Sequence, residues 1–281
     1  MEISKEDLES IKNAGISIFL NEIKSYYLLG NTNEYDSFEP SKINLENCTE
    51  FEKYKLACCL YAGFKIDEDE ELAFKLWQEG AEVGHKESML EYSVCLFNDE
   101  KIEDGFLMLQ DAANAGNKIA QFRIALCYMF GYGTKQNEKK AFTIFEKLAE
   151  ENFPNAVYMI GSFYMTDTEG FFVKRDTAKG WELIKKACSL GSPFAQYEVA
   201  IQLYVNEQNK EFTEDVFKLI KVSADNGDLR AQYLLALAYA KGEGVEVDLE
   251  MSMNYLAQSF DGGFPLAIEL MEKIKNSLRE E

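Results

Sequence analysis

Residues 231–248 read Ala-Gln-Tyr-Leu-Leu-Ala-Leu-Ala-Tyr-Ala-Lys-Gly-Glu-Gly-Val-Glu-Val-Asp, and the fold can be predicted from the pattern of these residues. Ala231, Leu235 and Tyr239 follow one another at intervals of four residues, which places them on one face of a helix. Ala236 lies beside that face and is small enough to let a neighbouring helix approach closely. The Gly-Glu-Gly triplet after this helix predicts a turn.

The same pattern recurs along most of the chain. Each copy starts four residues after an anchor residue, and the anchors are Gly84, Gly116, Asn152, Gly191, Gly227 and Gly263, at spacings of 32, 36, 39, 36 and 36 residues. A step of 36 residues back from Gly84 reaches Cys48, where the pattern begins. A second amphipathic segment leads into each anchor, with a bulky residue seven positions before it: Trp77, Leu109, Phe145, Ile184, Ile220 and Leu256.

Helix-boundary signals agree with this spacing. The anchor glycines suit the left-handed conformation that ends a helix. Pro154, Pro193 and Pro265 each follow an anchor by two residues, where proline fits the first turn of a helix. The segment 49–52 is typical of a capping box, and Asp69 and Asp228 are placed as N-caps. The sequence predicts six helix pairs over about 49–262 and a closing helix over about 264–279.

The repeat resembles the Sel-one-like repeat (SLR) family, which is related to tetratricopeptide helical repeats. The stretch 231–248 carries nearly the whole first half of the family pattern, and Ala73, Trp77, Ala81 and Gly84 match the second half. The resemblance covers about residues 49–275. It implies an all-α, right-handed α-solenoid of about six SLR helix-turn-helix pairs with N- and C-terminal capping helices.

Three units depart from the family pattern. The units that start at Ser88 and Ala195 lack the G-x-G turn, and the unit that starts at Ala156 carries three extra residues. Residues 1–45 do not match at all, so we expect them to form an N-terminal helical cap over the first repeat. Within this cap, a helix is predicted near 4–29 and a loop over 30–41. Residues 46–281 are then the solenoid with its C-terminal capping helix.

Charge is distributed unevenly. The chain carries 49 acidic and 29 basic residues, a net charge of −20. Residues 1–112 hold 25 of the acids and 10 of the bases, so their net charge is −15, against −5 for the remainder. Such a field repels nucleic acid and anionic membranes and attracts a basic partner. The alternative is that the acidity only keeps the protein soluble.

The histidine and cysteine content limits the kinds of catalytic and metal sites that the chain can form. His85 is the single histidine, which excludes zinc sites that need two, and its place in a turn favours an exposed residue. None of the six cysteines forms a C-x-x-C pair. We expect no cofactor and no metal. The acidic start at 2–7 lacks a secretory pattern and no stretch suits a membrane span, so a cytoplasmic protein without membrane insertion is expected.

Candidate binding residues come from solenoid geometry, because the first helices of related solenoids line a concave face. Positions seven and eleven after each anchor should point there, which gives Lys55, Glu91, Arg123, Cys127, Met159, Phe163, Glu198, Gln202 and Leu234. Such a mixed apolar and polar groove suits a protein ligand. The alternative is that tight curvature buries these side chains. Similarly, the aromatic residues six after the anchors are expected to pack between repeats rather than bind a ligand.

The sequence leaves three hypotheses for the function. The resemblance implies a non-enzymatic adaptor, scaffold, regulator or immunity protein, which points to a protein partner. The leading hypothesis is a scaffold that binds a basic partner on its acidic N-terminal half or concave groove, with a toxin-neutralising immunity protein as its sharpest form. The second is a regulatory adaptor that recruits an enzyme or peptide through the groove. An enzyme is the third, although the residues suggest no reaction. The oligomeric state stays open.

Overall fold

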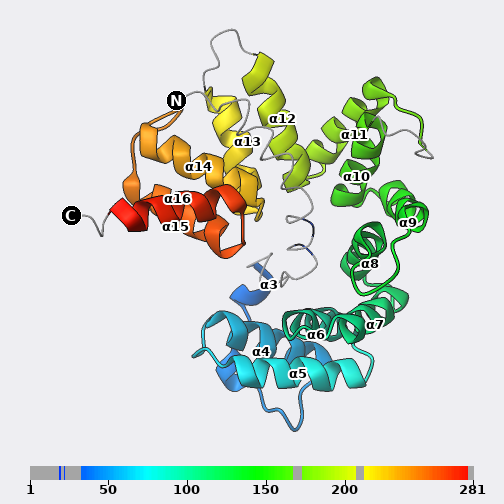
Figure 1. The fold of residues 1–281 in the computed structure, drawn as a ribbon. Coiled ribbons are helices and arrows are strands. Elements are labelled where there is room, and N and C mark those ends of the chain that lie inside the picture. The colour runs from blue at the N-terminus through cyan, green and yellow to red at the C-terminus, as the bar shows by residue number, and fades with distance from the viewer. Residues whose placement is uncertain (1–18, 20–21, 23–32, 167–172, 207–211, 278–281) are drawn as a thin grey trace. The chain divides into compact units, whose positions relative to one another are not determined.

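The computed structural model describes residues 19, 22, 33–166, 173–206 and 212–277, and their regular structure is helical throughout (Figure 1). The predicted pairs are α4 (Glu50–Ala62) with α5 (Glu70–Glu82), α6 (Lys86–Asn98) with α7 (Ile102–Asn114), α8 (Lys118–Phe130) with α9 (Glu138–Glu150), α10 (Pro154–Met165) with α11 (Thr177–Ser189), α12 (Pro193–Asn206) with α13 (Glu214–Asp225), and α14 (Leu229–Lys241) with α15 (Leu249–Asp261). The closing helix is α16 (Pro265–Ser277). The all-α repeat fold is confirmed.

Helices that follow one another in the chain also pack against one another. Contacts join α4 to α5, α6 to α7, α10 to α11, α12 to α13 and α14 to α15, and also link each of these pairs to a neighbouring helix. Two glycines allow α10 and α11 to approach each other closely. A β-carbon on Gly161 would lie 3.1 Å from the carbonyl oxygen of Gly180, so neither position has room for a side chain. Stacking therefore follows from the small residues of the repeat.

The chain divides into two compact units. One consists of residues 22–144, and the other combines residues 1–21 with 145–281. Each has its own core. Trp77 is fully buried in the first unit, among Leu56, Cys59 and Leu76. Ile220 and Leu235 are fully buried in the second.

The anchors adopt the predicted left-handed conformation. Their φ angles are +87° at Gly84, +88° at Gly116, +57° at Asn152, +90° at Gly191 and Gly227, and +79° at Gly263. A β-carbon at Gly84, Gly116, Gly191 or Gly227 would meet no atom within 4 Å. The glycines are therefore needed for their backbone conformation and not for space.

The second glycine of each G-x-G turn has a different role. A β-carbon on Gly133 would lie 2.7 Å from the Phe106 β-carbon and 2.8 Å from the Ile102 carbonyl oxygen. The equivalent Gly244 would meet the Phe212 carbonyl oxygen. These turns thus press against the start of the second helix of the preceding pair. The structure confirms them as repeat turns.

Helix caps form where the sequence places them. Thr49 and Glu52 make a reciprocal capping box at α4. Asp69 accepts a hydrogen bond from the Leu72 backbone N–H, and Asp228 accepts two, from the N–H groups of Arg230 and Ala231. These side chains satisfy donors that a helix end leaves without partners.

The aromatic residues six after the anchors pack inside the protein, as predicted. Tyr158 lies 5.7 Å from the Phe194 ring and Tyr233 lies 5.6 Å from the Phe264 ring, measured between centroids. Tyr158 and Tyr197 are buried. Phe194 also contacts Phe19, the nearest described position to the chain start, at 5.5 Å.

Most of the predicted N-terminal helix over 4–29 lies outside the described residues. The loop predicted over 30–41 needs correction, because α3 (Asn33–Asp36) is one helical turn and η1 (Pro40–Lys42) is a 3-10 turn. Tyr35 packs in the core of the first helix pair. The Lys65 ammonium donates to the carbonyl oxygens of Tyr35, Asp36 and Phe38, at 2.9, 2.7 and 3.4 Å. A lysine charge at the end of a short helix is favourable and holds it in place.

Candidate functional site

The nine residues predicted to line the concave face separate into two groups. Side chains of the first group are buried by the chain itself: Glu91, Arg123, Cys127, Met159, Phe163 and Leu234, none more than 6% exposed. Lys55, Glu198 and Gln202 reach the surface at least in part. The first group therefore fits the alternative interpretation, in which the packing of the solenoid buries these side chains. Binding through the concave face stays a prediction for the second.

Lys55 lies in a cluster of aromatic rings. Its ammonium nitrogen is 5.1 Å from the Tyr35 ring centroid, 5.8 Å from that of Phe38 and 4.9 Å from that of Phe51. These are cation–π distances, and they join the short N-terminal helix to α4. The structure therefore gives Lys55 a role within the fold.

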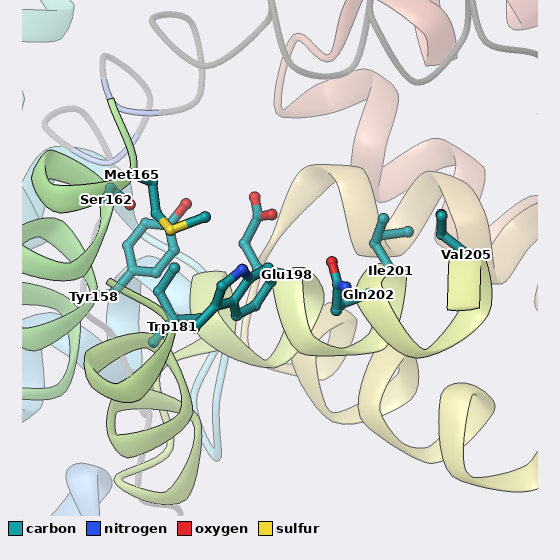
Figure 2. A pocket seen from close by; sticks show the side chains of 9 residues that line it. Tyr158, Ser162, Met165, Trp181, Glu198, Ile201, Gln202 and Val205 are labelled. Atoms are coloured by element: carbon teal, nitrogen blue, oxygen red, sulfur yellow. The ribbon is translucent and has the colours of Figure 1, made fainter. Parts of the chain in front are cut away.

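Glu198 and Gln202 come together at a pocket of about 530 Å³ between α10, α11 and α12 (Figure 2). This volume is in the range of ligand and peptide side-chain sites. The lining is mostly apolar, with a few polar groups: Tyr158, Ser162, Met165, Trp181, Ile184, Glu198, Ile201, Gln202 and Val205. Val205 is 51% exposed, so the apolar wall continues onto the open surface of α12.

The Glu198 carboxylate is part of a charged cluster behind the pocket. Arg230 binds Asp228 through two hydrogen bonds, of 3.1 Å from Nε to Oδ1 and 2.7 Å from its terminal nitrogen to Oδ2. Its other terminal nitrogen donates to Oε1 of Glu198 at 3.1 Å. The guanidinium also stacks 4.0 Å from the Tyr197 ring centroid. Two carboxylates thus share one guanidinium.

Burial shapes the protonation of this cluster. Burial alone would lower the pKa of Arg230, but its neighbours Asp228, Tyr158 and Glu198 together more than offset this effect, and the pKa lies above the ordinary value. Burial also raises the pKa of Tyr158 and Tyr197 well beyond the usual range. The phenols are therefore neutral and Arg230 is charged. The cluster of Asp228, Arg230 and Glu198 carries an excess of one negative charge when both carboxylates are ionised.

A second surface feature is acidic. The turns before α5 and α7, together with the first turns of these two helices, expose nine carboxylates, called the acidic edge below: Asp67, Glu68, Asp69, Glu70, Glu71, Asp99, Glu100, Glu103 and Asp104. Tyr61 and Cys95, near the ends of α4 and α6, belong to one packed cluster, so the two turns lie on the same edge of the repeat stack. Lys101 is bound to Asp99 at 3.1 Å and Lys65 to backbone carbonyls.

His85 and the cysteines have structural surroundings. His85 caps α6 and its Nδ1 lies 2.9 Å from the Ser88 hydroxyl oxygen. Its side chain is partly buried rather than fully exposed. All six cysteines are thiols. Burial raises the pKa of Cys58 and of Cys127 to about 12, which makes these thiols poor nucleophiles at neutral pH.

The described residues contain no group of three or more His, Cys, Asp or Glu side chains arranged to hold a metal ion. Among them, too, no helix combines the length and apolar character needed to cross a membrane.

Sequence reasoning missed most of the pocket. Trp181 was not singled out, because it lies on a second helix and the concave-face rule selects first helices only. Tyr158 was assigned to packing, which is correct for its ring, yet it also lines the pocket. The three extra residues of the α10 unit and the absent G-x-G turn after α12 are the signals in the sequence that this region differs.

Comparisons with known proteins agree with the repeat. A family model described as Sel1 repeat matches residues 53–85, 118–153, 154–192 and 229–264, which is just over half of the chain. Chitin synthase regulatory factor 3 of Schizosaccharomyces pombe is 31% identical over 139 residues, which cover 47% of this chain and 14% of that protein. The chain thus spans a small part of that relative's length.

Solved structures show the same fold. A Sel1 repeat protein from Oxalobacter formigenes superposes with a TM-score of 0.51 at 23% identity, over 82% of this chain and 66% of that one. An immunity protein from Pseudomonas aeruginosa superposes with a TM-score of 0.51 at 14% identity, over 81% of this chain and 86% of that one. At these identities the likeness speaks for architecture alone.

Proposed function

Because this chain belongs to the Sel1 repeat family, we propose that it is a non-enzymatic scaffold that binds a protein partner with a basic surface. The acidic edge is the observation that carries this proposal. Nine exposed carboxylates on two neighbouring turns and the helix starts that follow them, with both nearby lysines already bound, form a strongly negative surface. Such a surface speeds association with a basic partner and selects against acidic ones.

A toxin-neutralising immunity protein is the sharpest form of this proposal. An acidic solenoid would block a basic toxin by covering its active face. The likeness to an immunity protein concerns the fold, so the support for inhibition comes from the charge of the edge.

A regulatory adaptor is the second candidate. The match to a chitin synthase regulatory factor favours it, since that protein is named as a regulator. An adaptor leaves its partner active in the complex, whereas an immunity protein silences it. Activity of the captured partner, measured with and without this protein, separates the two.

The test starts with affinity capture from native lysate at low and high salt, with mass spectrometry of the retained proteins. We expect a stoichiometric basic partner that is released as salt rises, because salt screens exposed charges. A partner whose affinity does not depend on salt would contradict the proposed acidic interface.

Variants then locate the interface. The edge variant combines Asp67→Asn, Glu68→Gln and Glu100→Gln, which are exposed turn residues outside the helices. Its matched control combines Glu146→Gln, Glu182→Gln and Glu250→Gln, which are equally exposed and remove the same charge elsewhere. The edge variant should weaken binding and reduce its salt dependence, while the control should not. Equal effects of the two variants would show that only net charge matters.

A further inference from the structure

The pocket between α10, α11 and α12 has a charge and shape that specify an occupant. We propose that it binds an extended peptide segment of a protein partner, with one lysine or arginine side chain directed at Glu198 and a neighbouring apolar side chain on Ile201 and Val205. This inference rests on the proposed function only in assuming a protein partner. The site is separate from the acidic edge.

Within the described part of the chain, Glu198 uses only one of its two carboxylate oxygens. Arg230 uses only Oε1 of Glu198, and its main partner is Asp228, which it binds twice. Within the described residues, Oε2 of Glu198 has no hydrogen-bond or ion-pair partner. The side chain is 30% exposed, so the carboxylate reaches the pocket without being fully solvated. A cation from outside would complete the cluster.

The walls of the pocket around Glu198 include an indole ring and apolar side chains. Figure 2 shows the Glu198 carboxylate extending from α12 toward the side on which Tyr158 and Met165 lie. Trp181 lies next to it and is partly exposed. Basic side chains have a long apolar stem and a charged end, and indole is the best aromatic surface for a cation. This combination of a carboxylate and an indole suits such a side chain.

The residues along α12 set the direction of the bound peptide. Ile201 and Val205 follow Glu198 along α12 at intervals of three and four residues, so all three share one face of the helix. Figure 2 shows both aliphatic side chains on the same side as the carboxylate. When a basic residue of the peptide contacts Glu198, the next apolar residue of the extended peptide therefore lies over Ile201 or Val205. A small polar molecule would leave this apolar wall uncovered.

Comparison with equivalent positions supports the assignment. Glu91 and Arg123 occupy the position of Glu198 in the second and third repeats, and both are fully buried. Met159 and Leu234 occupy it in the neighbouring repeats and are buried as well. In the five repeats that follow the repeat of Lys55, the residue at this position is buried in four and lines the pocket in one, at Glu198.

The experiment uses the full chain and a display library of peptides with nine random residues. We expect selected peptides to carry lysine or arginine next to an apolar residue. The same selection on Glu198→Gln should lose the basic residue, while selection on Glu182→Gln should keep it. Glu182 is exposed on α11 and does not line the pocket, so it controls for the change of net charge. Failure to enrich any peptide overturns the proposal.

Synthetic peptides then measure the charge contribution. The best arginine peptide is compared with its citrulline analogue, which has the same shape but no charge. On the wild type the analogue should bind about tenfold more weakly, in keeping with a charge-assisted hydrogen bond. On Glu198→Gln the two peptides should bind equally, as expected for a coupled pair. Equal binding of both peptides to the wild type would refute the role of Glu198.

A spectroscopic readout places the peptide. The chain has two tryptophans, and Trp77 is fully buried, so a peptide-induced change in emission reports on Trp181. The change should disappear in Trp181→Phe. The edge variant should bind the peptide like the wild type, so failure of this site and failure of the acidic edge are distinguishable. An unchanged emission on saturation with peptide would place the peptide elsewhere.

Discussion

The α8–α9 and α12–α13 pairs reach the same architecture from different sequences. Residues 118–153 match the family model and carry the G-x-G turn, whereas α12 and α13 fall outside every matched segment and lack that turn. Yet Gly116 and Gly191 precede the two pairs with φ angles of +88° and +90°. Helical periodicity and the anchor therefore suffice for a helix pair. The second glycine of the G-x-G turn adds a close contact with the preceding pair, as Gly133 does with Phe106.

The two regions also differ in how charge stabilises them. Arg230, which bridges α14 and α12, is buried with Asp228, so Arg230→Met leaves a buried carboxylate without its cation. We expect a loss of about 3–5 kcal/mol in unfolding free energy, measured by urea denaturation. Lys140 lies on the surface 2.6 Å from the Tyr128 hydroxyl, and Lys140→Met should cost less than about 1 kcal/mol. Similar losses in both variants would contradict the distinction.

The turn of the α8–α9 pair provides the next test. Gly133→Ala combines a φ of +67° with a close contact to Phe106, so we expect a loss of about 2–4 kcal/mol. Gly116→Ala shares the left-handed strain but meets no atom within 4 Å, so only about 1–2 kcal/mol should be lost. Thermal unfolding of both variants measures the difference. If Gly116→Ala proved the more harmful, the anchor and not the turn would be the tighter position.

Alkaline pH should lower the stability of the fold, because two buried thiols resist losing their protons. Burial raises the pKa of Cys58 and Cys127 from about 9 to about 12, so the unfolded chain releases these protons first. Their stabilisation is complete below pH 9 and is lost as pH rises toward 12. At pH 10 the loss is about 1.4 kcal/mol for each thiol. Denaturation at pH 8 and 10 of the wild type and of Cys58→Ala/Cys127→Ala checks this, since the variant should show a smaller decrease.

The smallest effect concerns the turn of an unmatched pair. Glu100, between α6 and α7, has a φ of +62°, a conformation that glycine adopts without strain. Glu100→Gly should raise stability by about 1 kcal/mol, measured by thermal unfolding. Glu103→Gln removes a charge from the same edge without changing the backbone, and it should leave stability nearly unchanged. A gain in both variants would assign the effect to charge repulsion.

Local signals in the sequence predicted the fold, while the site needed tertiary information. Caps at Thr49 and Asp228 and the left-handed anchors depend on neighbouring residues, so spacing reveals them. The exposure of Met159 and Leu234 depends on how strongly successive pairs curve, which spacing does not encode. Likewise, Glu198 and Arg230 are 32 residues apart in the chain, and their pairing depends on the stacking of α12 and α14. Only Glu198 and Gln202 of the pocket were predicted by position.

The capping residues have a consequence for protein engineering. The second helices of five pairs begin after a side chain that accepts a backbone hydrogen bond: Asp69, Asn137, Asp176, Thr213 and Asp248. The turn before each of them varies in length and charge, while the helix start is fixed by its own cap. A loop from another protein can therefore be spliced in just before a cap, provided that the second glycine of a G-x-G turn is kept where it presses against the preceding pair. The turns of this fold are natural sites for exchanging recognition surfaces.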